Sequence, residues 1–319
     1  MDTILSTRKS VVARVRPIPR NKPFQRLAPL YWMTIPVFVM GVIFNYLPAW
    51  GWYLAFIDFQ PGIPVWDSVF VGLKYFARLF ETGSSFLVAF RNTVVLSLLG
   101  LLVLPAAVFF AVCVSEVKNK AFKTLVQTAS SLPYFVSWII VYAIFFFFLS
   151  VDNGYVNQVL LALGWIAEPI DFLGNVDYSW AILTASTIWK TLGYTAIVFI
   201  AAIAGLDQEL YEAAEIDGAS RSQKIMKITI PQIMPTFAVM TILTVGQMLN
   251  IGFEQYWSFR NPLTVDAVEV LDTYAYATGI AGFEFSYATA IGVFKTVASC
   301  VLLVFANGVF KKIMNRSIF

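Results

Sequence analysis

The sequence contains no histidine and only two cysteines among its 319 residues. Histidine and clustered cysteine are the usual ligands of zinc and other transition metals, and histidine is the common proton relay near neutral pH. Cys113 and Cys300 both lie inside apolar runs, where we expect buried thiols. The sequence therefore excludes the common zinc and iron sites and a histidine relay, and it does not predict a disulfide framework.

Charge is also scarce. Charged residues make up 13% of the chain and hydrophobic residues 59%, whereas soluble domains carry about 25% charged residues. A chain of this composition has lipid as its solvent. The first 26 residues are polar and basic, so we expect no cleavable signal peptide.

Six segments almost free of charge are long enough to cross a bilayer, which takes about 20 apolar residues. They are Leu27–Ile57, Asn92–Ser115, Thr124–Val151, Tyr178–Leu206, Gln232–Tyr256 and Ser286–Phe310. The sequence therefore predicts an all-α membrane protein with six transmembrane helices. A basic tail, residues 1–26, precedes a single membrane domain, residues 27–319.

The basic residues are distributed unevenly about these spans. Sixteen fall in the amino-terminal tail, the loops after spans two and four, and the carboxyl end. The opposite loops hold four, namely Lys74, Arg78, Arg91 and Arg260. By the positive-inside rule both termini lie in the cytoplasm of a multi-pass plasma-membrane protein. The net charge of +3 thus reflects topology and does not indicate nucleic-acid binding.

The loop between spans four and five, residues 207–231, is predicted to form a polar helical hairpin. Asp207 is a suitable N-cap for a helix over Gln208–Asp217. Gly218 suits the left-handed position that ends a helix. Ser220 and Gln223 have the spacing of a capping box for a second helix.

The first helix of this hairpin is acidic. Five carboxylates lie in or beside it, at Asp207, Glu209, Glu212, Glu215 and Asp217. An anionic cytoplasmic leaflet attracts basic segments, so lipid would repel this helix. Ala213, Ala214 and Gly218 are small and allow close approach of another backbone. The helix is therefore either a docking element for a basic protein groove or a solvated loop without a partner.

The spacing of these residues resembles the EAA signature of ATP-binding-cassette (ABC) importer permeases. Glu212-Ala213-Ala214 is followed after three residues by Gly218, and nine residues later by Ile228, one residue and Ile230-Pro231. The family usually has leucine where Ile230 stands. Six further segments resemble the branch that imports oligosaccharides and polysaccharide fragments, including alginate-type importers. They are Val71–Phe76, Arg91–Thr93, Asp152–Gly154, Gly252–Gln255, Asn261–Thr264 and Ser286–Ala290.

This resemblance implies the type I permease architecture and a set of partners. The hairpin would be the coupling helix, with Glu212, Ala213, Ala214 and Gly218 contacting an ATPase subunit. The chain has no Walker-type glycine loop, so a partner ATPase would bind ATP and magnesium and the chain itself would not be an enzyme. The other expected partners in the bacterial inner membrane system are a second, related permease, a second ATPase, an extracytoplasmic solute-binding protein and a sugar.

Polar groups within or beside the spans are candidates for the substrate pathway, because they are costly at membrane depth. The candidates are Asn45, Trp189, Lys190, Tyr194, Gln247, Asn250, Glu254 and Lys295. The spacing of Gln247, Asn250 and Glu254 predicts one shared face of span five. Amides and aromatic rings suit sugars, and the two lysines would suit an acidic sugar. Alternatively, these side chains hold helices together or reach the interface.

Two other classes of protein remain to be weighed. A secondary transporter or channel without an ATPase often shows inverted repeats, and none is visible here. A membrane enzyme such as a glycosyltransferase would need clustered carboxylates or a metal site. The acidic residues of the segment Asp152–Asp177 are scattered, which argues against that class.

Overall fold

The computed structural model describes residues 23–314 and divides into two units at Gly51 and Trp52. The first unit holds α1 (Pro23–Gly41), the π-helical η1 (Val42–Tyr46) and the start of the 3-10 helix η2 (Leu47–Phe56). Residues 1–22 of the predicted basic tail lie outside the described part. Helix α1 begins at Pro23, whose fixed φ suits a first helical position, and so starts before the predicted Leu27.

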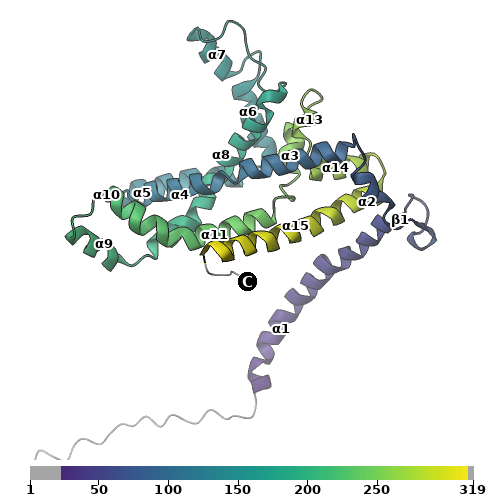
Figure 1. Ribbon diagram of the computed structural model, residues 1–319, viewed down its shortest axis with the longest axis horizontal. Helices are drawn as coiled ribbons and strands as arrows, with labels where there is room; N and C mark the ends of the chain where they lie inside the picture. Colours follow the sequence, from purple (N-terminus) through teal and green to yellow (C-terminus); the bar gives the residue numbers. More distant parts are fainter. Residues whose placement is uncertain (1–22, 315–319) are drawn as a thin grey trace, which may run out of the picture. The chain divides into compact units, whose positions relative to one another are not determined.

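The second unit is built from long apolar helices (Figure 1). Its spans are α3 with α4 (Ser85–Gly100, Val103–Ser115), α5 with η4 and α6 (Lys120–Ser131, Leu132–Phe135, Trp138–Leu149), α8 (Val176–Ala204), α10 with η5 and α11 (Arg221–Lys224, Ile225–Thr229, Ile230–Gly246), and α15 (Phe285–Met314). Together with the helical segment Leu30–Phe56, which begins in the first unit, the described residues contain five helices able to cross a membrane, or six with the bent pair around Val136 counted as one. The predicted helical membrane fold is confirmed.

Short elements connect the spans. They are β1 (Ile57–Asp58), η3 (Val65–Asp67), β2 (Val69–Phe70), α2 (Lys74–Leu79), α7 (Tyr155–Ala162), α9 (Gln208–Ile216), α12 (Glu254–Phe259), α13 (Val265–Val268), α14 (Leu271–Tyr276) and η6 (Ala277–Ala281). Strands β1 and β2 pair antiparallel, with Ile57 opposite Phe70. Within the second unit, α9 and α10 lie at one end, and α2 and α14 lie towards the other (Figure 1).

Small residues let the central helix α8 approach its neighbours closely. Ala107 and Ala111 of α4 are fully buried with Ala196 and Phe199 of α8 in one apolar cluster. A Cβ built on Gly193 would lie 2.1 Å from the carbonyl oxygen of Ser130, at the end of α5. Small residues are the usual means of close helix packing in membranes. They make α8 the shared partner of α4 and α5.

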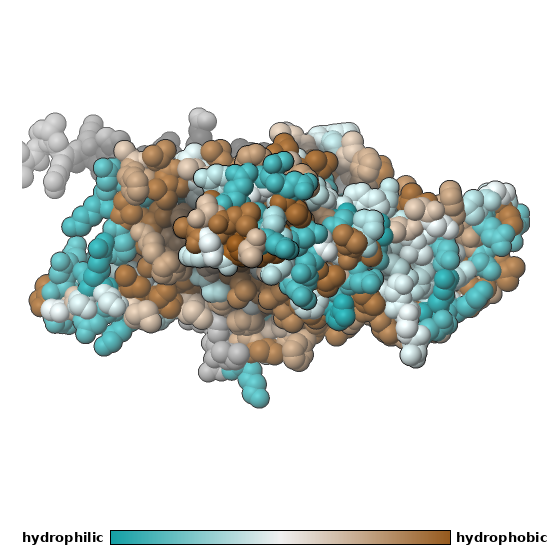
Figure 2. Space-filling view, turned by 90° about the horizontal axis from the view of Figure 1, so that it is seen from above, coloured by the Kyte–Doolittle hydropathy of each residue, from teal (hydrophilic) through white to brown (hydrophobic). Residues whose placement is uncertain are grey.

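Two sequence predictions are wrong. The fifth span ends at Gly246, not at Tyr256, and residues 247–253 are not helical. Gln247, Asn250 and Glu254 therefore do not share one helix face. Cys113 and Cys300 are exposed on this chain, because the apolar runs that contain them reach its outer surface. Broad apolar areas on the face shown in Figure 2 agree with such a lipid- or partner-facing exterior.

Candidate functional site

Local hydrogen bonds build the polar hairpin as its sequence predicts. The Asp207 carboxylate accepts from the Glu209 N–H at 3.0 Å. Gly218 has a φ of +73°, and the N–H of Ala219 donates to the Ala214 carbonyl at 2.9 Å. This is the bond that closes a Schellman motif. The capping box of Ser220 with Gln223 is also present.

The hairpin exposes the residues of the predicted coupling surface. Glu212, Ala213 and Gly218 are exposed, and Ala214 is half-buried. Ile216 is 88% exposed, although it is a large apolar residue. The sequence analysis did not single out Ile216. In the sequence, Ile216 could have been noticed as an aliphatic residue between the acidic residues Glu215 and Asp217. An exposed apolar side chain amid charges is typical of a protein-docking surface.

Side-chain contacts join the two arms of the hairpin to each other, and one of them, from Arg221, joins the hairpin to the end of α4. They are the hydroxyl pair Tyr211–Thr229 (2.9 Å) and the ion pairs Lys224–Glu215 (3.4 Å) and Arg221–Glu116. From Arg221 the chain continues as one helical segment of 26 residues to Gly246. A π-turn over Ile225–Thr229 precedes Pro231, whose missing N–H breaks the regular bonding pattern. Displacement of the hairpin would therefore act on the start of this long helix.

A cleft of about 320 Å³ lies at the other end of that helix. Its polar lining comes from α3, α8, α11 and the segment that follows α11. These polar residues are Ser97, Thr187, Thr191, Thr195, Thr244, Gln247, Asn250 and Gln255. Trp138 and Tyr256 add aromatic surface, and no charged residue is among the described residues that line the cleft.

Four threonines of α8 and α11, namely Thr187, Thr191, Thr195 and Thr244, line this cleft. Thr187, Thr191 and Thr195 are four residues apart on α8, which places them along one helix face. Thr191 donates its proton to the Thr187 carbonyl at 2.7 Å, and Thr244 donates to the Met240 carbonyl at 2.8 Å. A hydroxyl that donates to the backbone retains lone pairs. These oxygens can therefore accept hydrogen bonds from a ligand's hydroxyl groups.

Residues 103–316 match the family of binding-protein-dependent transport system inner membrane components. The chain belongs to this family. It is thus a multi-pass permease of an ABC importer, and the alternative of a secondary transporter or channel is wrong.

Individual relatives cover almost the whole permease. Protein LplB of Bacillus subtilis (strain 168) is 40% identical, over 91% of this chain and 91% of that protein. The polygalacturonan/rhamnogalacturonan transport system permease protein YteP of the same organism is 38% identical, over 91% of this chain and 90% of that protein. A chain of a bacterial alginate ABC transporter, solved in complex with an alginate pentasaccharide-bound periplasmic protein, is 35% identical, with a TM-score of 0.82 over 92% of this chain and 98% of that chain.

Of the predicted pathway residues, Gln247 and Asn250 line the cleft of the permease. Glu254 is exposed at the start of α12 and does not line it. Trp189 and Tyr194 lie elsewhere on α8. The Trp189 ring meets Phe145 edge-on, with 6.3 Å between centroids, and the Tyr194 ring stacks on Tyr134 at 3.8 Å. Asn45 lies in the first unit, exposed, and donates to the Gly41 carbonyl at 2.9 Å.

Lys190 is directed at the bend between η4 and α6. Its ammonium donates to the carbonyls of Pro133, Tyr134 and Val136, with a distance of 2.6 Å to that of Tyr134. The chain bends by 104° here, so the regular helical hydrogen bonds are interrupted, although the Pro133 carbonyl also accepts from the Val136 N–H at 3.1 Å. An ammonium has three protons and can satisfy three acceptors. This geometry favours the alternative in which Lys190 holds helices together.

Lys295 is likewise occupied. Its side chain is 9% exposed and pairs with the carboxylate of Asp272 in α14. Neither residue lines the cleft. Because the positive charge is neutralised within the protein, the arrangement favours the helix-holding alternative for Lys295 as well.

Sequence reasoning missed Gln255 and the threonine row. The nitrogen of the buried Gln255 amide lies within hydrogen-bonding distance of the Leu183 carbonyl (2.9 Å) and of the hydroxyls of Ser186 (3.1 Å) and Thr187 (2.8 Å). These bonds join α12 to α8. The four-residue spacing of the threonines was visible in the sequence. The sequence did not show that the fifth span ends at Gly246, and it is this end that brings Gln255 back towards α8.

Outside the spans, burial shifts the ionisation of several groups, among them Tyr75 and Glu269. The pKa of Tyr75 is raised to about 12 by burial and by its hydroxyl bond to Asp58, at 2.6 Å. Burial also raises the pKa of Glu269, and the guanidinium of Arg260, at 3.1 Å, opposes this shift. Glu269 follows α13, and its carbonyl accepts from the buried Asn92 of α3 at 2.9 Å. These contacts fasten the connecting segments to the spans.

Proposed function

We propose that this permease forms half of the translocation pathway of an ABC importer for an oligosaccharide or a polysaccharide fragment. One observation carries the proposal. A cleft lined by hydroxyl, amide and aromatic groups lies at one end of the helical segment Arg221–Gly246, and the exposed hairpin lies at its other end. The same chain thus offers a surface suited to sugars and a surface suited to a driving subunit.

The chemistry of the cleft supports a saccharide. Sugar hydroxyls would donate to the oxygens of Thr191 and Thr244, while ring faces would pack on Trp138 and Tyr256. The names of the polygalacturonan/rhamnogalacturonan and alginate relatives also point to saccharides, acidic ones included. In this chain, Lys190 and Lys295 do not supply the recognition of an acidic sugar. An acidic substrate would then meet its cationic partners on other subunits.

The hairpin would receive the driving force. Glu212, Ala213, Ala214 and Gly218 would contact a basic cleft of an ATPase subunit, and Ile216 would add an apolar contact. ATP and magnesium would be bound by that subunit, so this chain would have no catalytic role. The excess of basic residues around the spans supports a cytoplasmic position for the hairpin and both termini.

The complete importer would contain a second, related permease, two ATPases and an extracytoplasmic solute-binding protein. The cleft, about 320 Å³, is at the small end of ligand sites, which measure roughly 300–1,000 Å³. A second permease would supply the rest of the pathway. A different chain in that role would explain how acidic groups are recognised, since the described residues that line the cleft in this chain include no cation.

Reconstitution in lipid vesicles tests the proposal. The assay is ATP-dependent uptake of galacturonate, alginate and neutral arabinose oligomers by the purified complex. Glu212→Lys should abolish co-purification of the ATPase and uptake. Glu81→Lys makes the same charge change at an exposed position between α2 and α3 and should leave both intact. The proposal fails if no oligomer is taken up, or if ATPase binding and uptake both survive Glu212→Lys.

A further inference from the structure

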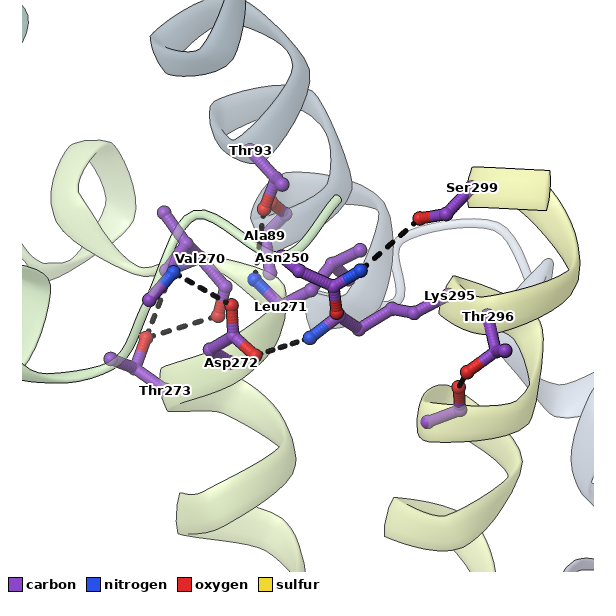
Figure 3. A network of polar contacts seen from close by, with 12 residues as sticks. Ala89, Thr93, Asn250, Val270, Leu271, Asp272, Thr273, Lys295, Thr296 and Ser299 are labelled. Carbon is purple, nitrogen blue, oxygen red and sulfur yellow. Dashed lines mark hydrogen bonds and ion pairs between the residues drawn. The ribbon is translucent and has the colours of Figure 1, made fainter. Parts of the chain in front are cut away.

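One carboxylate, that of Asp272, contacts two segments outside its own helix, and its pair with Lys295 can be followed in Figure 3. Asp272 of α14 pairs through Oδ1 with Lys295 of α15. Its second oxygen, Oδ2, accepts from the backbone N–H of Gly252 at 3.3 Å. Gly252 belongs to residues 247–253, which connect α11 to α12 and which we call the cleft loop. Asp272 therefore contacts the cleft loop as well as α15.

Hydrogen bonds to residues of α15 and α3 also hold the cleft loop in position. The Asn250 amide donates to the Ser299 hydroxyl of α15 at 3.3 Å. The Ser97 hydroxyl of α3 donates to the Met248 carbonyl. Gly252 has a φ of +102°, a conformation that L-residues rarely adopt. The loop is thus held in one particular conformation by groups on other helices.

The cleft loop is also where the long helix meets the cleft. The helical segment that starts at Arg221 beside the hairpin ends at Gly246, immediately before the loop. Gln247 and Asn250, both in the loop, line the cleft. Movement of the helix must therefore be taken up by the loop or passed on to the groups that hold it.

We propose that Asp272, held in place by Lys295, is a positioning residue that fixes the cleft loop and thereby orients Gln247 and Asn250 towards the substrate. This role rests on the proposed function of the cleft. The pair itself is almost buried, with 9% of the Lys295 side chain and 22% of the Asp272 side chain exposed. A buried pair by itself is a weak source of stability. An ion pair that only bridged α14 and α15 would not require the second oxygen of Asp272 to contact the cleft loop.

Two double variants separate positioning from stability. Asp272→Asn/Lys295→Met removes both charges but keeps a side-chain oxygen for the Gly252 N–H. Asp272→Leu/Lys295→Met has nearly the same shape and has no acceptor. Both are made in the full complex, and this chain also carries Cys113→Ser, Cys300→Ser and Gln247→Cys, so that its one thiol lies in the cleft loop and is followed on this chain after denaturing electrophoresis. The readout is the rate of its modification by N-ethylmaleimide without nucleotide, beside the unfolding temperature of the complex.

The leucine variant should react at least threefold faster or slower than the parent, while the asparagine variant should stay within twofold of it. Equal rates for both variants, in complexes that unfold at the parent's temperature, would overturn the proposal. If the leucine variant does not assemble, Asp272→Lys/Lys295→Asp takes its place. It keeps opposite charges but places an ammonium near the Gly252 N–H, so the rate should again change; a parental rate overturns the proposal. The assay uses no sugar, and failure of the proposed substrate would leave its result unaffected.

Discussion

Replacing Lys190 with methionine removes the ammonium from the bend between η4 and α6 and keeps most of the side chain's length. The carbonyls of Pro133, Tyr134 and Val136 then lose the ammonium as a donor. Side-chain hydrogen bonds in membrane bundles average about 0.6 kcal/mol, so three such bonds amount to about 2 kcal/mol. For a chain of this size that corresponds to a fall of about 4 °C in unfolding temperature.

The measurement is thermal unfolding of the purified complex in detergent, followed by tryptophan fluorescence. Lys190→Arg keeps the charge and several donors and should recover at least half of the loss. The control is Thr184→Val, six residues earlier on α8. The Thr184 hydroxyl donates to the Trp180 carbonyl of the same helix at 2.7 Å, so its loss should change the unfolding temperature little. An unchanged unfolding temperature for Lys190→Met, together with selective loss of acidic-oligomer uptake, would refute the structural role and return Lys190 to the pathway.

Three further predictions follow. Thr191→Val should lower uptake efficiency of the transported oligomer about two- to tenfold, since one hydrogen bond contributes about 0.5–1.5 kcal/mol; unaltered uptake kinetics would remove Thr191 from the pathway. Gly218→Ala places a side chain at a φ of +73° at a cost of about 1–2 kcal/mol and should weaken ATPase binding, whereas Gly205→Ala, with no atom nearer than 3.6 Å, should not; pull-down with the ATPase compares them. Because burial raises the pKa of Glu269 above its ordinary 4.5, its contribution to stability is fully present below that pH and is lost as pH rises through the raised value. Unfolding temperatures measured from pH 4 upwards should therefore depend less on pH in Glu269→Gln, and an identical profile would contradict the assignment.

The amino-acid sequence alone determined the features that depend on short-range interactions. Asp207, Gly218 and the capping box of Ser220 with Gln223 shape the hairpin through bonds between residues five or fewer positions apart. Local patterns of caps and turns therefore predict it closely. The spans could be found in the same way, because crossing lipid requires long apolar runs whatever their neighbours are.

Only the tertiary structure decided where the fifth helix ends and which groups the two membrane lysines contact. The loop that follows Gly246 contacts Ser97 and Asp272, which lie 151 and 20 residues away from their partners in the chain. The partners of Lys190 lie 54 to 57 residues away in the chain, and the partner of Lys295 lies 23 residues away. A charge at membrane depth must find a partner, but the sequence does not show whether that partner is a substrate or another helix. Packing of distant segments decides this, because it alone determines which carbonyls and carboxylates come within hydrogen-bonding distance.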